Sequence, residues 1–488
     1  MKFPDEPMFR GFQRPNRFET EILGVEVVQG EVPDDLQGAY FRVGPEPQYP
    51  PKLGTDIPFN GDGMVARFWF EAGRVDFRCR WVRTPKFVAE REAGKALFGA
   101  YRNPFTDDPS VKGLPRGTAN TNIVWHGGRM FALKEDSHPV EIDPLTLETL
   151  GPWDYDGRLH SVTSTAHPKI DPRTGALVFF GYAARGETTP DIAYYEADAS
   201  GQISFERWFE APYSSMVHDF AVTENHIVFP IVPLISDLQR LKEGYPHFAW
   251  DPSKPVYLGV AARRDPTAPV RWFVGENRFA SHMMNAYEEG DRIHIDTSVG
   301  DSVAFPFFPE VDGAAFDPVA ATPYVSRWTV DLSRPTSDFD QVRLAEIPGE
   351  FPRIDERRAT EDYRYGFLCM QGPADDMPGS LAGFRFNLIG RVDHRGGLVT
   401  HDVGPASATQ EPIFVPRPGS VDEGDGYVLA LVNRYAEMRS DLLVLDAQNL
   451  DGEPLATVAL PTRLRNGLHG TWLSAADLAA YSPPEPHL

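Results

Sequence analysis

Short apolar runs separated by turn-forming residues extend over almost the whole chain. The 42 glycines and 45 prolines are spread along the sequence and interrupt these runs at frequent intervals. This spacing is typical of an all-β fold, because strands are short and glycine and proline favour the turns between them. The clearest strand-turn-strand patterns cover Thr121 to Glu135, Thr163 to Tyr182 and His282 to Ser298.

Helical periodicity is rare in this sequence. Apolar residues at helical spacing are clearest at Ile235 to Glu243 and Ser474 to Tyr481, so we expect only short helices. No low-complexity tract or charge run marks a domain boundary, and strict repeats of the WD type are absent. We therefore expect one continuous domain over residues 1–488, with a long-bladed β-propeller and a pair of β domains as the two architectures to consider.

The stretch Ser214 to Pro230 is predicted to form a strand, a polar turn and a returning strand. In an extended segment His218 would share one face with Phe220 and Val222. An imidazole held among apolar neighbours can ligate a metal. A lone histidine in such a place is nevertheless more often a core residue bonded to a backbone carbonyl, so the position alone leaves both interpretations open.

Charge and cysteine content restrict the partners and the compartment. The 47 basic and 70 acidic residues give a net charge of -23, which argues against nucleic acids and anionic membrane surfaces as partners. The two cysteines, Cys79 and Cys369, form neither a disulfide framework nor a CxxC motif. The N-terminus lacks the apolar region of a signal peptide, and no run approaches the ~18 apolar residues of a spanning helix. We expect a cytoplasmic protein, without integral membrane contact, that acts on a small neutral or weakly acidic substrate.

Four of the thirteen histidines lie among small or apolar residues at predicted strand ends, namely His167 (STAHPKID), His218 (MVHDF), His282 (ASHMMNAY) and His469 (GLHGTW). Their spacing matches no local metal-binding motif. In a propeller, however, the innermost strands converge on one axis, so distant residues can meet there. The other histidines are interpreted as structural or surface residues; surface roles are expected for His126, His226 and His487.

Several short motifs, in this order along the chain, are shared with a known family. They are FNGDGM at Phe59 to Met64, STAHPKID, VHDF, EPIFVPRPG and the closing GLHGTW. From about Gly38 to Trp472 the chain resembles a carotenoid cleavage oxygenase. The resemblance implies a seven-bladed β-propeller with one ferrous iron per chain on its axis, dioxygen as co-substrate, and His167, His218, His282 and His469 as iron ligands.

The resemblance also implies three glutamates behind three of the histidines, and the matching positions are Glu135, Glu350 and Glu411. A carboxylate that accepts the second ring N–H of a ligating histidine fixes its tautomer and orientation. Imidazole ligands alone do not select iron over zinc, copper or nickel, so iron is implied by the family only. Thr121 resembles a threonine that crowds one of the remaining coordination positions in some family members.

Within the family, Phe59, Tyr101 and Lys134 resemble the substrate-contacting residues of a bacterial subgroup that cleaves lignostilbenes. The implied substrate is a 4-hydroxystilbene, whose central double bond would be cleaved to two aromatic aldehydes. Removing the phenolic proton activates the alkene; Lys134 can stabilise the phenolate, while Tyr101 can donate to the same oxygen and relay the proton. Phe59 and Phe305 would supply apolar walls for the rings.

Alternatives remain open from the sequence. The same iron site could cleave carotenoids or apocarotenoids, an isomerase exists within the family, and a propeller could serve as a binding scaffold with structural histidines. A homodimer is compatible with the resemblance, although no interface can be identified. Lys134 and Glu135 are adjacent, so a regular strand would direct them to opposite faces. We expect Glu135 to point to the axis and Lys134 to line an adjoining channel.

Overall fold

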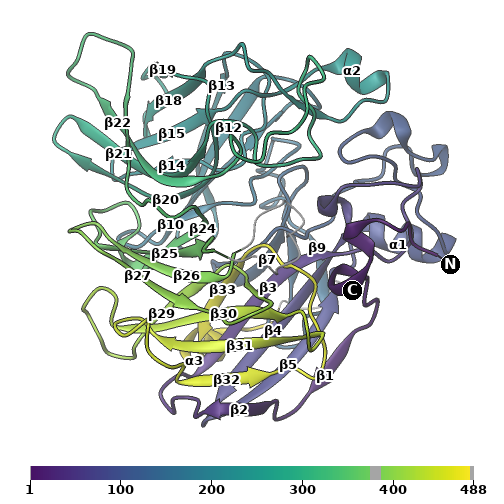
Figure 1. Cartoon of the computed structure of the whole chain (residues 1–488). Coiled ribbons are helices and arrows are strands. Elements are labelled where there is room, and N and C mark those ends of the chain that lie inside the picture. The colour runs from purple at the N-terminus through teal and green to yellow at the C-terminus, as the bar shows by residue number, and fades with distance from the viewer. Residues whose placement is uncertain (1, 374–385, 484–488) are drawn as a thin grey trace.

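The computed structural model describes residues 2–373 and 386–483. Within this part of the chain, seven antiparallel sheets of four to six strands are arranged around one axis, and a two-stranded sheet is added to them (Figure 1). The protein is thus a seven-bladed β-propeller, as the family resemblance implies.

The strands of each blade are given in sheet order. The first blade contains β1 (Thr20–Ile22), β5 (Arg74–Trp81), β4 (Asp62–Glu71), β3 (Gly38–Glu46) and β33 (Gly470–Ser474), and the second contains β6 (Asn122–His126), β7 (Arg129–Leu133), β8 (Val140–Ile142) and β9 (Thr149–Pro152). The third blade contains β10 (Lys169–Asp171), β11 (Ala176–Tyr182), β12 (Asp191–Ala197) and β13 (Ile203–Glu210), and the fourth contains β14 (Ala221–Val222), β15 (His226–Ile231), β18 (Val256–Ala262) and β19 (Arg271–Gly275). The fifth blade contains β20 (Phe279–Glu289), β21 (Arg292–Gly300), β22 (Tyr324–Asp331) and β23 (Asp340–Arg343), and the sixth contains β24 (Gly349–Ile354), β25 (Tyr365–Met370), β26 (Leu388–Asp393) and β27 (Leu398–Asp402). The seventh blade contains β2 (Glu26–Gly30), β32 (Ala456–Ala459), β31 (Arg439–Asp446), β30 (Gly426–Arg434) and β28 (Ser407–Thr409), and β29 (Ile413–Pro416) also pairs with β30.

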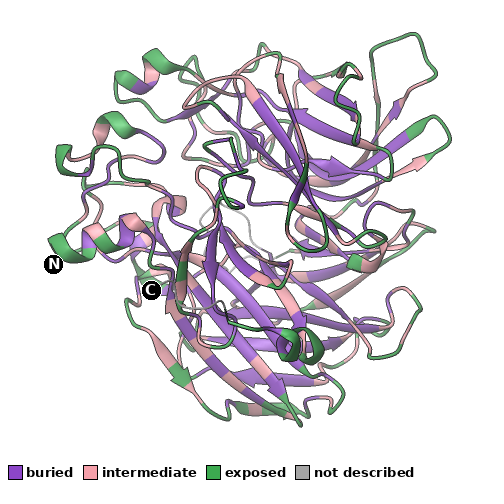
Figure 2. Ribbon diagram, turned by 180° about the vertical axis from the view of Figure 1, so that it is seen from behind, coloured by how far each residue is buried: buried purple, intermediate pink, exposed green. Residues whose placement is uncertain are grey.

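Strand burial follows from the position of each strand in its blade. In β5 buried and more exposed residues alternate, with Val75, Phe77, Cys79 and Trp81 buried. This is the period of two expected for a strand with one face on the core. Strand β30 is instead buried along nearly its whole length, because its alternate side chains pack into two different hydrophobic clusters. Buried residues predominate in the strands of the ring (Figure 2). The core therefore lies between adjacent blades.

The two ends of the chain close the ring. Strand β2 pairs with β32 of the last blade, while β33 pairs with β3 of the first blade. Segments more than 400 residues apart thus share two sheets. Because neither blade is complete without strands from both ends, we propose that residues 1–488 form one domain.

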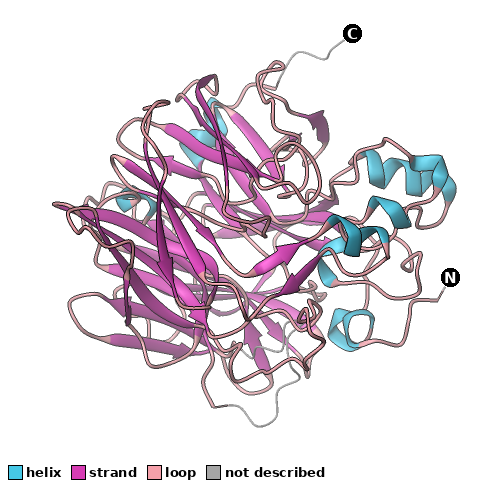
Figure 3. Cartoon of the chain, turned by 90° about the horizontal axis from the view of Figure 1, so that it is seen from above, coloured by secondary structure: helices cyan, strands magenta, loops and turns pink. Residues whose placement is uncertain are grey.

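Helices are few and short, as expected. Among the described residues they are α1 (Pro85–Ala93), α2 (Leu238–Lys242) and α3 (Ala475–Ala480), with the 3-10 turns η1 (Pro7–Phe9), η2 (Gly11–Gln13), η3 (Pro58–Asn60), η4 (Pro104–Thr106), η5 (Pro109–Val111) and η6 (Glu356–Arg358). The patterns at 235–243 and 474–481 correctly located α2 and α3, whereas α1 was not predicted. Helices α1 and α2 lie to one side of the ring (Figures 1 and 3). None of the helices described is long and apolar enough to cross a membrane.

An insertion in the fourth blade lies outside the four-stranded pattern. Strands β16 (Leu234–Ser236) and β17 (Phe248–Trp250) pair with each other and flank α2. The backbone amide of Trp250 donates to the Pro309 carbonyl at 2.9 Å, and the rings of Phe248 and Phe308 lie 5.6 Å apart. The insertion therefore supports the loop that contains the Phe305 to Phe308 run.

The predicted hairpins are present, but some are shorter than expected. Strands β6 and β7 meet at Gly127 and Gly128, both with positive φ, and β20 and β21 form the third hairpin. In the segment around His218 the predicted strand, turn and returning strand are present as β14 and β15. The first strand is shorter than expected and begins after the histidine, so His218 itself does not lie in a strand. His126 is buried rather than at the surface, and its ring bonds the Gly175 carbonyl. His487 lies outside the described residues.

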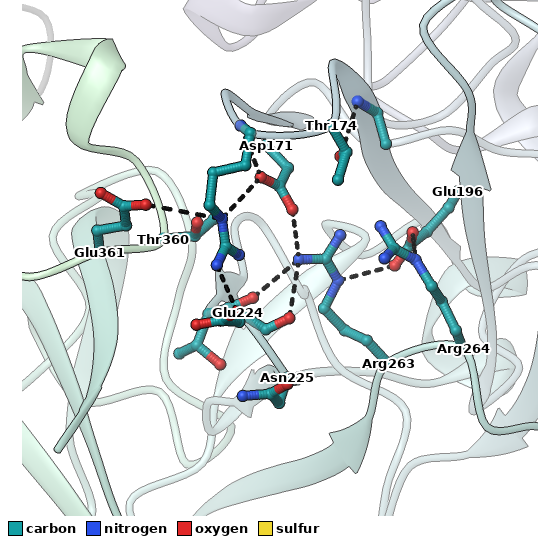
Figure 4. Close-up of polar contacts among 12 residues, drawn as sticks. Asp171, Thr174, Glu196, Glu224, Asn225, Arg263, Arg264, Thr360 and Glu361 are labelled. Atoms are coloured by element: carbon teal, nitrogen blue, oxygen red, sulfur yellow. Dashed lines mark hydrogen bonds and ion pairs between the residues drawn. The ribbon is translucent and has the colours of Figure 1, made fainter. Parts of the chain in front are cut away.

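Charged residues link neighbouring blades (Figure 4). Arg263 is buried and donates to Asp171 and Glu196 of the preceding blade. Arg173 forms ion pairs with Glu224 of the next blade and with Glu361, which follows η6. These contacts fix the relative positions of blades that share no strand.

Candidate metal centre and substrate cavity

Four histidines meet on the propeller axis. His167 precedes β10, His218 precedes β14, His282 lies in β20 and His469 precedes β33. Because these are edge strands of four different sheets, and several such edge strands contact one another around the axis, residues 302 positions apart in sequence come together. Each of the four residues offers a ring nitrogen, and these four nitrogens all lie within 4.8 Å of one another.

The spacing of the ring nitrogens fits one metal ion. The Nε2 atoms of His167 and His218 are 3.1 Å apart, and those of His218 and His282 are 3.2 Å apart. Nitrogens at a metal–nitrogen distance of about 2.1 Å and at right angles to each other are separated by about 3.0 Å. The cluster can therefore hold a metal through four imidazoles.

Three buried glutamates orient three of these histidines. The Nδ1 atoms of His218, His282 and His469 donate to carboxylate oxygens at 2.7, 2.6 and 2.7 Å respectively; the acceptors are Glu135, Glu350 and Glu411. With Nδ1 occupied in this way, Nε2 is left to face the metal position. No carboxylate bonds His167 in the described part of the chain.

The environment of the cluster favours charged glutamates. Burial would raise the pKa of Glu135, but the His218 ring, Lys134 and Arg102 lower it to about 2. Burial would also raise the pKa of Glu411, but His469 and Arg353 lower this pKa to about 2. The site therefore contains buried carboxylates that can balance a cation without ligating it.

The histidines differ in their tendency to be protonated. Burial lowers the pKa of His167, and the other three rings lower it further. Burial also lowers the pKa of His469 to about 4, despite the opposite effect of Glu411. Burial would lower the pKa of His282 as well, but the opposite effect of Glu350 is larger and the pKa of His282 is raised. Neutral imidazole, the form that ligates metals, is thus favoured at His167 and His469.

A bulge in β24 brings Glu350 to its histidine. The pairing of β24 with β25 shifts register between Glu350 and Arg353. Phe351 within this bulge has a positive φ of 56°, and its ring stacks on His282 with centroids 5.2 Å apart. The irregular backbone thus places a carboxylate on Nδ1 and an aromatic ring on the face of the same histidine.

An aromatic cavity adjoins the cluster. Its walls include all the predicted substrate-side residues and three of the four histidines: Phe59, Tyr101, Thr121, Lys134, Phe305, His218, His282 and His469. The ring of Phe59 meets those of Phe305 and Phe307 edge to face at 5.4 and 5.3 Å. These three rings, called the aromatic slot below, line the same cavity as His218, His282 and His469.

Lys134 and Glu135 lie beyond the end of β7, so strand alternation does not govern their directions. The Glu135 side chain bonds His218, whereas the Lys134 ammonium lies 4.9 Å from the Tyr101 ring centroid and 3.4 Å from the Phe59 carbonyl. Both line the same cavity. Lys134 is 4% exposed and, in the described part of the chain, forms no ion pair with a carboxylate. Burial lowers its pKa.

Sequence reasoning missed four polar residues of the site. Arg353 donates to Glu411, Ser281 donates to Glu350, Tyr182 donates to Glu135, and Arg102 donates to Tyr182. Ser281 adjoins His282 and Arg102 adjoins Tyr101, so adjacency was the only available signal for these two. Tyr182 and Arg353 are remote in sequence from the groups that they contact.

Comparison with known proteins agrees with this geometry. The sequence profile of the family described as "Retinal pigment epithelial membrane protein" matches residues 13–474. The chain belongs to this family. The carotenoid cleavage oxygenase resemblance deduced from the short motifs is therefore confirmed.

Relatives of this chain match over nearly its full length. It is 49% identical to lignostilbene-alpha,beta-dioxygenase isozyme III of Sphingomonas paucimobilis, covering 98% of this chain and 99% of the relative. It is 46% identical to an isoeugenol monooxygenase of Pseudomonas nitroreducens, with coverage of 96% and 98%. The crystal structure of Pseudomonas brassicacearum lignostilbene dioxygenase superposes with a TM-score of 0.93 at 42% identity, covering 97% of this chain and 100% of that one.

Proposed function

We propose that this protein is a non-haem Fe(II) dioxygenase that cleaves the central double bond of 4-hydroxystilbenes with dioxygen and releases two aromatic aldehydes. Support comes from a relative and a solved structure, both described as lignostilbene dioxygenases, that match nearly the entire chain. The observation that carries the substrate assignment is the buried Lys134 ammonium, which faces an aromatic cavity without a carboxylate partner among the described residues.

His167, His218, His282 and His469 would hold the iron, with Glu135, Glu350 and Glu411 behind three of them. Bound ferrous iron supplies the activation of dioxygen. The chain's own residues orient the alkene and move the phenolic proton. Thr121, which lines the cavity close to His469, restricts the space beside the metal position.

The role of Lys134 follows from its surroundings. A buried cation without a partner is costly, and a phenolate would neutralise it. The ammonium would lower the energy of the phenolate and so favour electron release toward the conjugated alkene. A carotenoid has no phenol that could ionise against this cation, so a buried ammonium without a carboxylate partner among the described residues argues against carotenoid cleavage. The convergence of four imidazoles likewise argues against a purely structural scaffold.

A second candidate is a phenol conjugated with a shorter alkene, because an isoeugenol monooxygenase is 46% identical over the same residues. Such a substrate would use Lys134 and Tyr101 in the same way. It would lack the second ring that the Phe59, Phe305 and Phe307 slot can cover. Relative kcat/KM for a 4-hydroxystilbene and for isoeugenol separates the two.

The test is aldehyde formation by the iron-loaded protein. We expect two aromatic aldehydes from a 4-hydroxystilbene in air and none under anaerobic conditions. We also expect most activity to be lost when the 4-hydroxyl is methylated. Product formation without oxygen, or equal rates for the phenol and its methyl ether, would contradict the proposal.

A further inference from the structure

Glu135 is the meeting point of two tyrosine hydroxyls and one metal-site histidine. Its Oε1 accepts hydrogen bonds from Tyr101 at 3.1 Å and from Tyr182 at 2.8 Å. Its Oε2 accepts from His218 Nδ1 at 2.7 Å. All of these groups are largely buried, so no competition from bulk water weakens their directions.

Arg102 fixes the direction of one of these bonds. A guanidinium group can only donate, and Arg102 Nη1 donates to the Tyr182 hydroxyl. The single proton of Tyr182 must therefore point to Glu135. Arg102 Nη1 itself is 3.8 Å from Glu135 Oε1, beyond hydrogen-bond distance. The Tyr182 hydroxyl thus links the guanidinium to the carboxylate and keeps the two groups apart.

The same carboxylate determines which hydrogen bond the Tyr101 hydroxyl donates and which it can accept. Glu135 can only accept, so Tyr101 uses its one proton on Glu135 and leaves its oxygen lone pairs for another partner. Lys134, in the same cavity, can only donate. A hydroxyl group bound between them would donate to Tyr101 and accept from Lys134. An ether oxygen in that place could accept but not donate.

Hydrogen bonds to neighbouring residues hold the backbone around Arg102 in place. Arg102 has a positive φ of 50°, and its carbonyl accepts a 2.7 Å hydrogen bond from His247 Nδ1. The adjacent Asn103 donates from Nδ2 to the Leu241 carbonyl at 2.9 Å. His247 and Leu241 belong to the β16–β17 insertion, which therefore ties the Tyr101–Arg102 pair to the fourth blade.

We propose that Tyr182 and Arg102 are positioning residues that keep the Tyr101 hydroxyl as a hydrogen-bond acceptor for the free 4-hydroxyl of the substrate. This inference rests on the proposed function and deepens it, because it assigns the preference for a phenol over its ether to named groups. It reverses the direction first expected for Tyr101, which was donation to the phenol. Without the Tyr182 hydroxyl, Arg102 would pair directly with Glu135 and offset its charge. The carboxylate would then be a weaker acceptor for Tyr101, whose proton could turn into the cavity.

The experiment measures dissociation constants for 4-hydroxystilbene and 4-methoxystilbene with iron-loaded protein under anaerobic conditions, where no turnover occurs. For Tyr182→Phe we expect about tenfold weaker binding of the hydroxystilbene, the loss typical of one hydrogen bond. Binding of the methoxystilbene should change less than about twofold. In a Tyr101→Phe background, Tyr182→Phe should have almost no further effect, because it acts through Tyr101.

The outcomes separate the possible failures. Equal weakening of both ligands, or multiplicative effects of Tyr182→Phe and Tyr101→Phe, would overturn the positioning role. Wild-type protein that binds both ligands equally would instead refute the proposed phenol specificity itself. Tyr194→Phe is the matched control, because Tyr194 is a buried tyrosine that donates to a glutamate away from the cavity, and it should leave both constants unchanged. If Tyr182→Phe does not fold, Arg102→Met, which removes the donor to the Tyr182 hydroxyl, serves as the second variant, and an unchanged preference for the phenol in it would overturn the proposal.

Discussion

Replacing Lys134 by methionine should lower activity and raise stability at the same time. The ammonium has one long hydrogen bond, 3.4 Å to the Phe59 carbonyl, and otherwise faces the rings of Tyr101 and Phe59 at 4.9 and 5.7 Å. A hydrogen bond to a charged partner contributes about 1.5–3 kcal/mol, so losing the contact with a phenolate should reduce kcat/KM by roughly 10- to 150-fold. Methionine has a similar volume and carries no charge, so the free energy of unfolding should increase by about 1 kcal/mol.

The assay combines aldehyde formation, metal content and denaturant unfolding of the same preparations. Lys86→Met is the matched control, since Lys86 is also buried but pairs with Asp62 at 2.9 Å and Glu90 at 3.0 Å. Breaking that pairing should destabilise the protein by about 3–5 kcal/mol. Unchanged kcat/KM in Lys134→Met would refute the phenolate role, and iron loss equal to that of Glu135→Gln would place Lys134 in the metal site instead.

Three further predictions concern the metal site, the aromatic slot and ring closure. Glu135→Gln should weaken metal retention by about 10- to 100-fold, measured as metal content after dialysis against a chelator, and full retention would argue against the orienting role of Glu135 toward His218. Phe305→Ala should raise KM for a 4-hydroxystilbene more than for isoeugenol, because Phe305 packs on Phe59 in the slot proposed for the second ring; equal changes would disprove that placement. Deleting residues 470–488 removes β33 from the first blade and should abolish cooperative thermal unfolding, and a sharp transition at the wild-type temperature would contradict the need for closure.

Sequence pattern predicted an all-β fold because strands and turns follow local rules, whereas the seven-bladed propeller was implied only by the family resemblance. Glycine and proline turns mark hairpins such as β6–β7, where Gly127 and Gly128 supply the positive φ values of a tight turn. The same rules failed near His218, where the chain crosses the inner edge of a blade. There the tertiary contacts of Asp219, which pairs with Lys169 and accepts from the Met283 amide, fix the backbone without regular pairing.

The family resemblance implied the four histidines and the three glutamates behind them, but the residues that contact Glu135 from other blades could not be found from the sequence. Tyr182 resembles any buried tyrosine of a strand, and Arg102 resembles any loop arginine. Only folding brings the Tyr182 hydroxyl within 2.8 Å of a glutamate 47 positions earlier in the chain. Their meeting depends on the relative rotation of two blades, and this rotation leaves no mark in the sequence around either residue.

Glu135 couples the two halves of the site, and this coupling limits how each half can vary. One carboxylate oxygen orients His218 at the metal position, while the other determines the direction of the Tyr101 hydroxyl. A substitution that retunes phenol binding through Glu135 must therefore also disturb a metal ligand. Substrate preference can change independently of the metal only at residues that avoid this carboxylate. The Phe59, Phe305 and Phe307 rings meet that condition, so variation in substrate range is expected there first.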